Sequence, residues 1–201
     1  MGEELLKQIK FIIEWAIPIV IGLLIALIIG QFFGRQKIIG SSMSPNLKNS
    51  EIVYRLNKAK IKRNAIISFY AHGIDKNKPT TAKTIYVKRV IGMPGDRIRY
   101  SQQGKLFING KLQAQNYIPN KQRKFGTLTP PARYKEATGV NIFENTTFVV
   151  PQNSYFVLGD NRKISNDGRY YGFVPKNKII GVIKVPFWIN KHKLINSVPN
   201  S

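Results

Sequence analysis

The chain of 201 residues contains no cysteine, only two histidines and only ten acidic residues. The absence of cysteine excludes disulfides, thiolate metal sites and a cysteine nucleophile. His72 and His192 lie in polar, loop-like stretches, so neither is a good candidate for a catalytic base or a metal ligand. Because 32 lysines and arginines face the ten acids, the formal net charge is +22. We therefore expect an attraction to anionic lipid, anionic cell-surface polymer or nucleic acid, and charge alone does not choose among them.

A long apolar run lies near the beginning of the chain. From Trp15 to Phe33 the sequence reads WAIPIVIGLLIALIIGQFF, in which Gln31 is the only strongly polar residue. At about 1.5 Å per residue, a helix of this length spans close to the ~30 Å hydrocarbon core of a bilayer. A cleavable signal peptide would have a shorter apolar region and a small-x-small cleavage site, so we predict a permanent transmembrane anchor over 11–34. Basic residues flank the run on both sides, which leaves its orientation open.

The remaining residues, 35–201, consist of short β-rich runs between turn signals. Asn109-Gly110 between alternating apolar residues is typical of a type I′ hairpin. A basic segment at about 113–146 contains Pro130-Pro131 and lacks clear periodicity, so we expect it to be an excursion from the β scaffold. The sequence predicts one mostly β domain, a coiled antiparallel sheet or barrel, with one N-terminal transmembrane helix. The expected strands lie within 37–43, 51–56, 65–70, 84–92, 96–100, 105–114, 146–150, 154–159 and 178–189.

Three punctuated segments stand out within this domain. They read IIGSSMSPNL at 38–47, YVKRVIGMPGDRI at 86–98 and GDNRKISNDGRYYGFVP at 159–175. Each segment alone has a structural explanation as a strand exit or a turn, for example Pro94-Gly95 in GMPGD. Considered together they indicate a catalytic site, because they contain serines and a lysine. A serine nucleophile needs a base, and neither histidine suits that role.

Lys88 is the candidate base. It lies in the otherwise apolar run TIYVKRVIG, where strand alternation places Tyr86, Lys88 and Val90 on one face. A lysine that faces inward is desolvated, which favours the neutral amine. To act as a base near neutral pH, Lys88 must have its pKa lowered from about 10.4, the value for an exposed lysine, towards about 7–8.

The three segments and the apolar run resemble, in order and spacing, the sequence boxes of bacterial type I signal peptidases. These are membrane-anchored Ser/Lys endopeptidases that remove signal peptides from exported proteins. The resemblance covers nearly the whole chain apart from 100–150, and it implies a mostly β catalytic domain outside the cytoplasm over 35–201. It implies a cytoplasmic N-terminus over 1–10, cleavage after an Ala-x-Ala-like motif and activity without metal or cofactor. The expected partners are signal-peptide-bearing precursors and anionic membrane lipid, and no nucleic acid is expected.

Onto this sequence the resemblance carries specific roles. Ser42, directly before Met43, matches the nucleophile, whereas Ser41 does not. Lys88 is similar to the family's general base, and Ser165 resembles the serine whose hydroxyl orients the lysine amine.

Other residues match structural or substrate-binding positions. Arg89 resembles a structural neighbour of the base, and Asp167 and Arg169 resemble an ion pair that holds the third segment in place. The segments Ile38–Gly40 and Ile85–Val87 are the expected strand edges for an extended substrate. The expected cleft residues are Ile38, Ile39, Met43, Ile85, Tyr86 and Val87, and the side chains expected in the membrane interface are those of Ile38, Ile39, Met43 and Phe187-Trp188.

The sequence departs from the family pattern at several positions. Gly40 stands where many members have a hydroxyl that binds the oxyanion. The Ser42 N–H is therefore one expected oxyanion donor, and the identity of the second donor, at or near Gly40, stays open. Arg63-Asn64-Ala65 replaces a common Arg-Gly-Asp. The other replacements, in the third segment, are Lys163, Ile164 and Gly168.

Two rival functions stay open. A membrane-tethered basic binding protein on an inactive signal-peptidase scaffold could use the basic stretch KLQAQNYIPNKQRKFG, but this stretch has no recognisable nucleic-acid-binding motif and reads better as a solvated face. A self-cleaving repressor-like Ser/Lys protease shares the chemistry, but the transmembrane run and the third segment argue against it.

Overall fold

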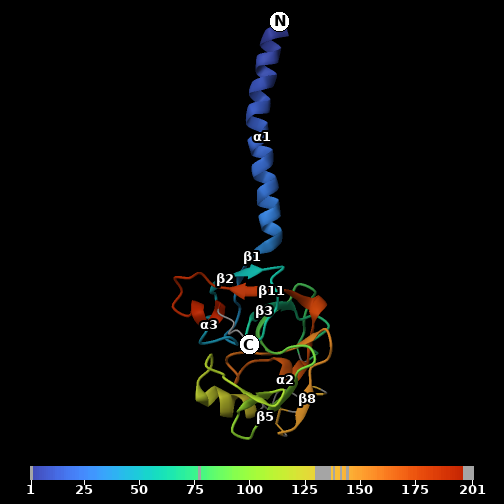
Figure 1. Ribbon diagram of the computed structural model, residues 1–201, viewed down its shortest axis with the longest axis vertical. Coiled ribbons are helices and arrows are strands. Elements are labelled where there is room, and N and C mark those ends of the chain that lie inside the picture. Colours follow the sequence, from blue (N-terminus) through green and yellow to red (C-terminus); the bar gives the residue numbers. More distant parts are fainter. Residues whose placement is uncertain are drawn as a thin grey trace. The chain divides into compact units, whose positions relative to one another are not determined.

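A computed structural model describes residues 2–76, 78–129, 137, 139–140, 142–143 and 145–196 (Figure 1). The chain divides into two compact units, Met1–Gly34 and Arg35–Ser201. Much of the predicted excursion, including Pro130-Pro131, lies outside the described residues.

The first unit consists mainly of helix α1, Gly2–Phe32. Among the described residues it is the one helix long and apolar enough to cross a membrane. Its apolar side chains are exposed, including Trp15 at 62% and Leu27 at 67%, as expected for a helix that faces lipid. The predicted N-terminal apolar helix is confirmed, although residues 2–10 continue the helix and Phe33 already belongs to a strand.

The second unit contains two antiparallel sheets, which confirms the predicted fold class. The larger sheet consists, in spatial order, of β1 (Phe33–Lys37), β2 (Ile52–Leu56), β11 (Ile179–Lys184), β3 (Ile66–Tyr70), β4 (Ile85–Gly92), β9 (Ser154–Leu158) and β10 (Val174–Pro175). The smaller sheet consists of β7 (Lys111–Gln113), β6 (Leu106–Ile108), β5 (Arg97–Tyr100) and β8 (Thr147–Val149). Within this unit β5 and β8 lie at the end opposite to β1 and β2 (Figure 1).

The predicted hairpin joins β6 to β7. Asn109 and Gly110 have φ angles of 52° and 79°, as the positive φ at both central positions of a type I′ turn requires. Leu106 pairs with Gln113, and Ile108 pairs with Lys111. The hairpin predicted from Asn109-Gly110 is therefore confirmed.

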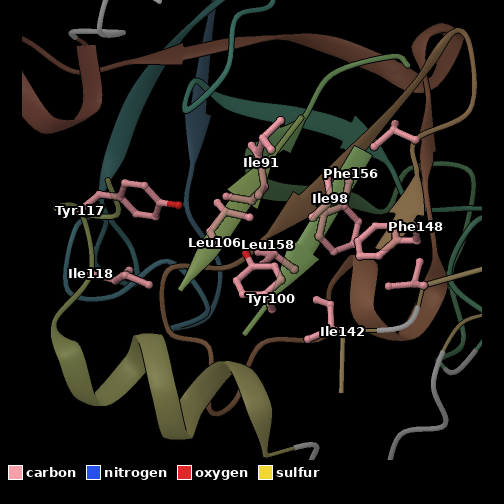
Figure 2. Close-up of a cluster of buried hydrophobic side chains, with 13 residues drawn as sticks. Ile91, Ile98, Tyr100, Leu106, Tyr117, Ile118, Ile142, Phe148, Phe156 and Leu158 are labelled. Carbon is pink, nitrogen blue, oxygen red and sulfur yellow. The ribbon is translucent and has the colours of Figure 1, made fainter. Parts of the chain in front are cut away.

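A buried cluster joins the two sheets (Figure 2). Ile91 of β4 and Phe156 of β9 lie in one cluster with Ile98 of β5 and Phe148 of β8. The rings of Phe148 and Phe156 meet edge to face, with centroids 5.1 Å apart. Burial of each such side chain contributes about 1.5–3 kcal/mol, so this cluster holds β4 and β9, which lead into the candidate site.

The expected strand at 37–43 is wrong beyond Lys37. Gly40 has a φ of +89°, which ends the extended backbone, and Ile38–Met43 forms a loop. Ile38 and Met43 are 3% and 1% exposed because they pack in a cluster with Val53 of β2. They therefore do not lie among the exposed side chains expected in the membrane interface, whereas Ile39 remains 89% exposed.

Four short helical elements were not predicted, and one predicted strand is too long. The strand expected over 178–189 ends at Lys184, shortly before Pro186, which has no N–H for a ladder. The helical elements are η1 (Gln122–Gly126), α2 (Gly168–Tyr171), η2 (Lys176–Lys178) and α3 (His192–Asn196).

Candidate active site

Ser42 and Lys88 meet although 46 residues separate them in the sequence. Lys88 Nζ lies 2.9 Å from Ser42 Oγ and 3.1 Å from the carbonyl oxygen of Val87. Strand β4 supplies Lys88, and the loop between β1 and β2 supplies Ser42. The pair has the geometry that a nucleophile and its base require.

Burial determines the state of the Lys88 amine. The residue is 4% exposed, and burial lowers the pKa of Lys88 to about 8. The charge of Asp167 opposes this shift, as do the charges of Asp160 and Asp75, whereas that of Lys78 adds to it. A pKa near 8 makes the neutral amine, which can accept a proton, accessible close to neutral pH.

Residues of the third segment, 159–175, form hydrogen bonds with the loop that carries Ser42. The Asn161 backbone N–H donates to the carbonyl oxygen of Ser42 at 2.9 Å, and its side-chain amide donates to that of Ser41 at 3.3 Å. Asn46 Nδ2 donates to Asp160 Oδ2 at 2.7 Å. These bonds fix the main chain on both sides of the Ser42 side chain.

Arg89 lies next to Lys88 on β4 but has a different environment. Its guanidinium binds Asp160 in a bidentate ion pair, with Nε–Oδ1 and Nη2–Oδ2 distances of 2.8 and 2.7 Å. It also stacks on the Tyr117 ring, with 4.4 Å from Cζ to the ring centroid. Burial alone would lower the pKa of Arg89, but the charge and hydrogen bonds of Asp160 outweigh this effect and raise it. Arg89 therefore stays charged.

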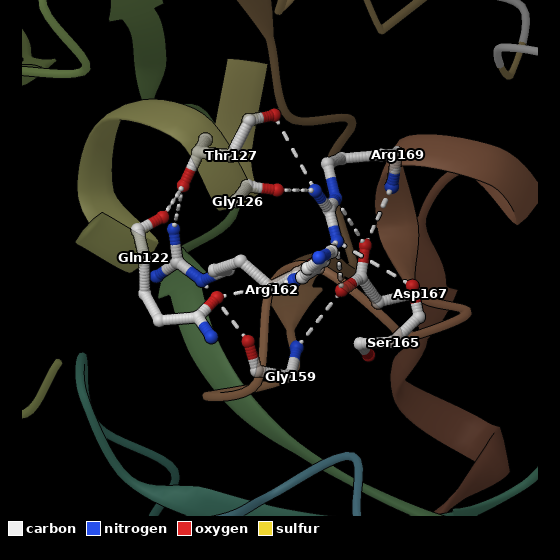
Figure 3. A network of polar contacts seen from close by, with 9 residues as sticks. Gln122, Gly126, Thr127, Gly159, Arg162, Ser165, Asp167 and Arg169 are labelled. Atoms are coloured by element: carbon white, nitrogen blue, oxygen red, sulfur yellow. Dashed lines mark hydrogen bonds and ion pairs between the residues drawn. The ribbon is translucent and has the colours of Figure 1, made fainter. Parts of the chain in front are cut away.

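Asp167 and Arg169 form a second bidentate pair, completely buried (Figure 3). Arg169 Nε lies 2.8 Å from Asp167 Oδ1, and Nη2 lies 3.0 Å from Oδ2. Burial would raise the pKa of Asp167, but the charge and hydrogen bonds of Arg169 lower it. Asp167 Oδ2 also accepts the Gly159 N–H at 3.0 Å, so the pair ties both ends of the 159–169 loop together.

Ser165 lies within this loop and is completely buried. Its Oγ has no hydrogen-bond partner within the residues that the structure describes, and none is drawn in Figure 3. A Cβ on Gly159 would collide with Ser165 Oγ and would lie 2.6 Å from the carbonyl oxygen of Ser42. Ser165 is thus adjacent to Ser42, but the structure does not join its hydroxyl to the Lys88 amine.

The basic excursion supports this loop, which the sequence did not predict (Figure 3). Arg162 Nη1 donates to Thr127 Oγ1 at 2.8 Å, and Arg169 Nη1 donates to the Gly126 carbonyl oxygen at 2.8 Å. Gln122 Oε1 accepts the Lys163 N–H at 3.1 Å. The sequence contains no local signal for these contacts, because each joins residues more than thirty positions apart.

The backbone N–H groups of Gly40 and Ser42 differ in whether they are free to bind an oxyanion. The Gly40 N–H donates to Asn49 Oδ1 at 2.8 Å, so it is already occupied. The Ser42 N–H makes no hydrogen bond within the described part of the chain. The structure therefore leaves the Ser42 N–H available and Gly40 engaged.

A cleft of about 430 Å³ opens beside Ser42 and Lys88. Its floor and walls include all six predicted cleft residues, together with Lys37, Lys78, Lys83 and Asn166, which the sequence did not single out. One edge of β4 pairs with β3 along Ile85–Arg89, and the opposite edge pairs with β9 only through Arg89, Val90 and Gly92. The other edge of Ile85–Val87 is therefore open to the cleft, whereas Ile38–Gly40 is a loop and not the expected strand edge.

The departures from the family pattern fit the structure. Asn64 has a φ of +64°, a left-handed conformation that asparagine tolerates better than most residues with a Cβ. Ala65 is buried in a core cluster, and Arg63 instead forms a 2.7 Å ion pair with Asp96. Gly168 packs tightly against Phe156, where a Cβ would lie 2.8 Å from that ring.

The histidines lie away from the cleft. Neither His72 nor His192 is among its lining residues, and each has Nδ1 3.0 Å from a backbone carbonyl oxygen. Within the described residues, no group of three or more His, Cys, Asp or Glu side chains could hold a metal ion.

Comparison with known proteins gives concordant matches. A family model described as signal peptidase, peptidase S26, matches residues 12–188. Signal peptidase IB of Staphylococcus aureus strain COL is 34% identical over 186 residues, which cover 89% of this chain and 91% of that protein. Probable signal peptidase I-2 of Synechocystis sp. is 36% identical over 154 residues, which cover 74% of this chain and 60% of that protein. A solved structure of a signal peptidase I from Enterococcus faecalis V583 is 31% identical with a TM-score of 0.44, covering 62% of this chain and 97% of that one.

Proposed function

Because the chain belongs to the signal peptidase family, peptidase S26, we propose that Ser42 is the nucleophile and Lys88 the general base of its reaction. Family membership makes the chain a serine peptidase with signal peptidase I activity and makes precursor proteins its substrates. The observation that carries the two proposed roles is the 2.9 Å approach of the buried Lys88 amine to Ser42 Oγ.

In the proposed mechanism the neutral Lys88 amine takes the proton of Ser42 Oγ as this oxygen attacks the scissile carbonyl carbon. The Ser42 N–H stabilises the resulting oxyanion. The Lys88 ammonium then protonates the departing amine, and the mature protein leaves. A water molecule, deprotonated by Lys88, finally hydrolyses the acyl-enzyme, so a single amine serves as base and acid.

The substrate is proposed to bind as an extended strand on the open edge of Ile85–Val87. Shallow pockets between Ile38 and Val87 would accept small side chains, which corresponds to cleavage after an Ala-x-Ala-like motif. Ser165 is proposed to orient the Lys88 amine when substrate is bound, and the Asp167–Arg169 pair to hold Ser165 in place. No cofactor takes part.

The membrane topology is likewise a proposal. Residues 11–34 anchor the chain, 1–10 lie in the cytoplasm and 35–201 form the catalytic domain outside. The exposed side chains of Ile39, Phe187 and Trp188, at 89%, 76% and 67%, are suited to a membrane interface, and the positive surface is suited to anionic lipid. Labelling Ser41→Cys in intact cells with a membrane-impermeant thiol reagent tests this orientation.

Cleavage of an Ala-x-Ala precursor in lipid vesicles tests the chemistry. The full-length Ser42→Ala variant should lose activity, whereas Ser41→Ala should keep most of it, because only Ser42 lies beside Lys88. Equal loss in both folded variants would contradict the assignment of the nucleophile. A binding protein on an inactive scaffold would cleave no precursor in any form.

A further inference from the structure

The cleft beside Ser42 carries an unbalanced positive charge. Four lysines line it, and no aspartate or glutamate occurs among its described lining residues. The carboxylates that act on Lys88 lie behind its walls and are at most 4% exposed. These buried carboxylates are Asp75, Asp160 and Asp167, whose hydrogen bonds are directed to protein groups.

Two of these lysines belong to segments that each lead to one member of the dyad. Lys37 precedes Ser42 by five residues, and Lys83 precedes Lys88 by five. At about 3.3 Å per residue, each lies at most ~17 Å along its segment from the dyad. Both side chains are exposed, and neither forms an ion pair within the described residues. The cleft lining thus contains, besides the dyad, two exposed ammonium groups without an ion-pair partner in the described part of the chain.

We propose that Lys37 and Lys83 form a carboxylate-binding subsite that selects precursors with an acidic residue four to six positions before the scissile bond. The inference rests on the proposed function, because it takes Ser42 as the point of attack. A peptide extended along the open edge of Ile85–Val87 from the dyad approaches the turn Thr81–Thr84, which precedes β4 and carries Lys83, about four to six residues before the scissile bond. Its carboxylate would enter the field of both ammonium groups, whereas a basic side chain at the same position would be repelled.

The test uses the full-length protein in uncharged detergent micelles and soluble Ala-x-Ala peptides. The peptides differ only at the fifth position before the bond, which is Glu, Gln or Lys. The wild type should cleave the Glu peptide with a kcat/KM about three- to fivefold above that of the Gln peptide, and the Lys peptide more slowly still. The ratio should fall towards one as salt rises to about 1 M, where the Debye length is about 3 Å.

Charge variants provide the decisive comparison. The double variant Lys37→Gln/Lys83→Gln should bring the Glu-to-Gln ratio close to one, and Lys37→Glu/Lys83→Glu should invert the order so that the Lys peptide is preferred. Lys111→Gln removes an exposed lysine of β7 that does not line the cleft, so it is the matched control and should keep the wild-type ratio.

Three outcomes would overturn the subsite: equal cleavage of the Glu and Gln peptides by the wild type, a ratio unchanged in the double variant, or the same loss of ratio in Lys111→Gln. If the double variant loses only binding to phosphatidylglycerol vesicles, the lysines bind lipid headgroups and the proposal is wrong. Cleavage of the Gln peptide by the wild type and its absence in Ser42→Ala report separately on the proposed function, so the two failures can be told apart.

Discussion

Two neighbouring residues of β4, Lys88 and Arg89, are both buried cations with opposite fates. Lys88 forms no ion pair within the described residues, and burial lowers its pKa to about 8. Arg89 is bound by Asp160 through two hydrogen bonds, and its pKa rises. Since adjacent strand residues point to opposite faces, one strand presents a reactive amine on one side and a permanent charge on the other.

The difference shows what a buried cation needs to keep its charge. A guanidinium meets a carboxylate in a planar, bidentate geometry that compensates for lost hydration. An ammonium without such a partner becomes easier to deprotonate. Burial in the same strand thus makes the Lys88 amine easier to deprotonate, whereas Arg89 stays charged and links β4 to Asp160.

The largest expected effect comes from replacing Lys88, the reactive amine of β4. Lys88→Met should retain the fold and lower kcat/KM for a precursor by about a thousandfold or more, because among the described residues Lys88 alone hydrogen-bonds Ser42 Oγ. Lys88→Arg should lose activity to the same extent, since a guanidinium does not deprotonate at neutral pH. Steady-state cleavage with circular dichroism as the folding control measures both. Substantial activity in the Arg variant would contradict a neutral base.

On the structural side, Arg89→Met should lower the free energy of unfolding by about 3–5 kcal/mol, because it leaves Asp160 buried without its counter-ion. Unfolding of the detergent-solubilised protein by denaturant measures this loss. The double variant Arg89→Met/Asp160→Leu should recover part of it, since no buried charge is left unpaired. A single variant as stable as the wild type would show that the pair contributes little.

The sequence predicted those parts of this arrangement that depend on local pattern. Alternation placed Lys88 on an inward face, and turn chemistry fixed the Asn109-Gly110 hairpin. Nine of the runs between turn signals were expected to be strands, and the main error among them, at Ile38–Met43, arose because Gly40 leaves the extended conformation there. Apolar content alone does not distinguish a buried loop from a strand.

The parts that depend on distant contacts could not be predicted. Arg89 and Asp160 are 71 positions apart, and Gln122 and Asn161 are 39 apart. Polar residues of the basic excursion read as solvated loop because their partners lie in another segment. The family resemblance supplied candidate roles for Ser42, Lys88 and Ser165, but Lys37, Lys78 and Lys83, the other lysines of the cleft, had no motif to mark them.

A smaller effect concerns stability and pH. The folded-state pKa of Lys88, about 8, lies below the value of 10.5 for an exposed lysine, so folding releases a proton between these pH values. The unfolded state binds more protons there, so stability should rise as pH increases from about 8 to 10.5. Lys88→Met lacks this dependence and should be more stable than the wild type at pH 7 by up to about 3 kcal/mol, a gain that shrinks towards pH 10.5. Parallel denaturant titrations at both pH values measure it, and a constant difference would contradict a depressed pKa.

The smallest expected effect is a shift in the pKa of Lys88 caused by substituting a nearby charged residue and leaving Lys88 itself unchanged. Asp75 Oδ2 accepts hydrogen bonds from Tyr86 OH at 2.8 Å and Asn166 Nδ2 at 2.5 Å, and its charge raises the pKa of Lys88, as do those of Asp167 and Asp160. Asp75→Asn keeps an acceptor for Tyr86 but removes the charge, so the pKa of Lys88 should fall and the acid limb of the kcat/KM profile should move to lower pH.

A second variant, at Lys78, should shift the pKa of Lys88 in the opposite direction. The positive charge of Lys78 lowers the pKa of Lys88, so Lys78→Gln should move the acid limb to higher pH. At pH 6.5 the two variants should differ by about two- to threefold in rate relative to their own plateaus, as expected when a single charge near the amine is removed at each site. The direction of the two pH shifts is more informative than their size. A purely structural defect would lower the plateau rate of a variant but would not move the acid limbs of the two variants apart. Movement of both limbs in the same direction, with cleavage intact, would mean that Lys88 is not the group whose deprotonation sets the acid limb.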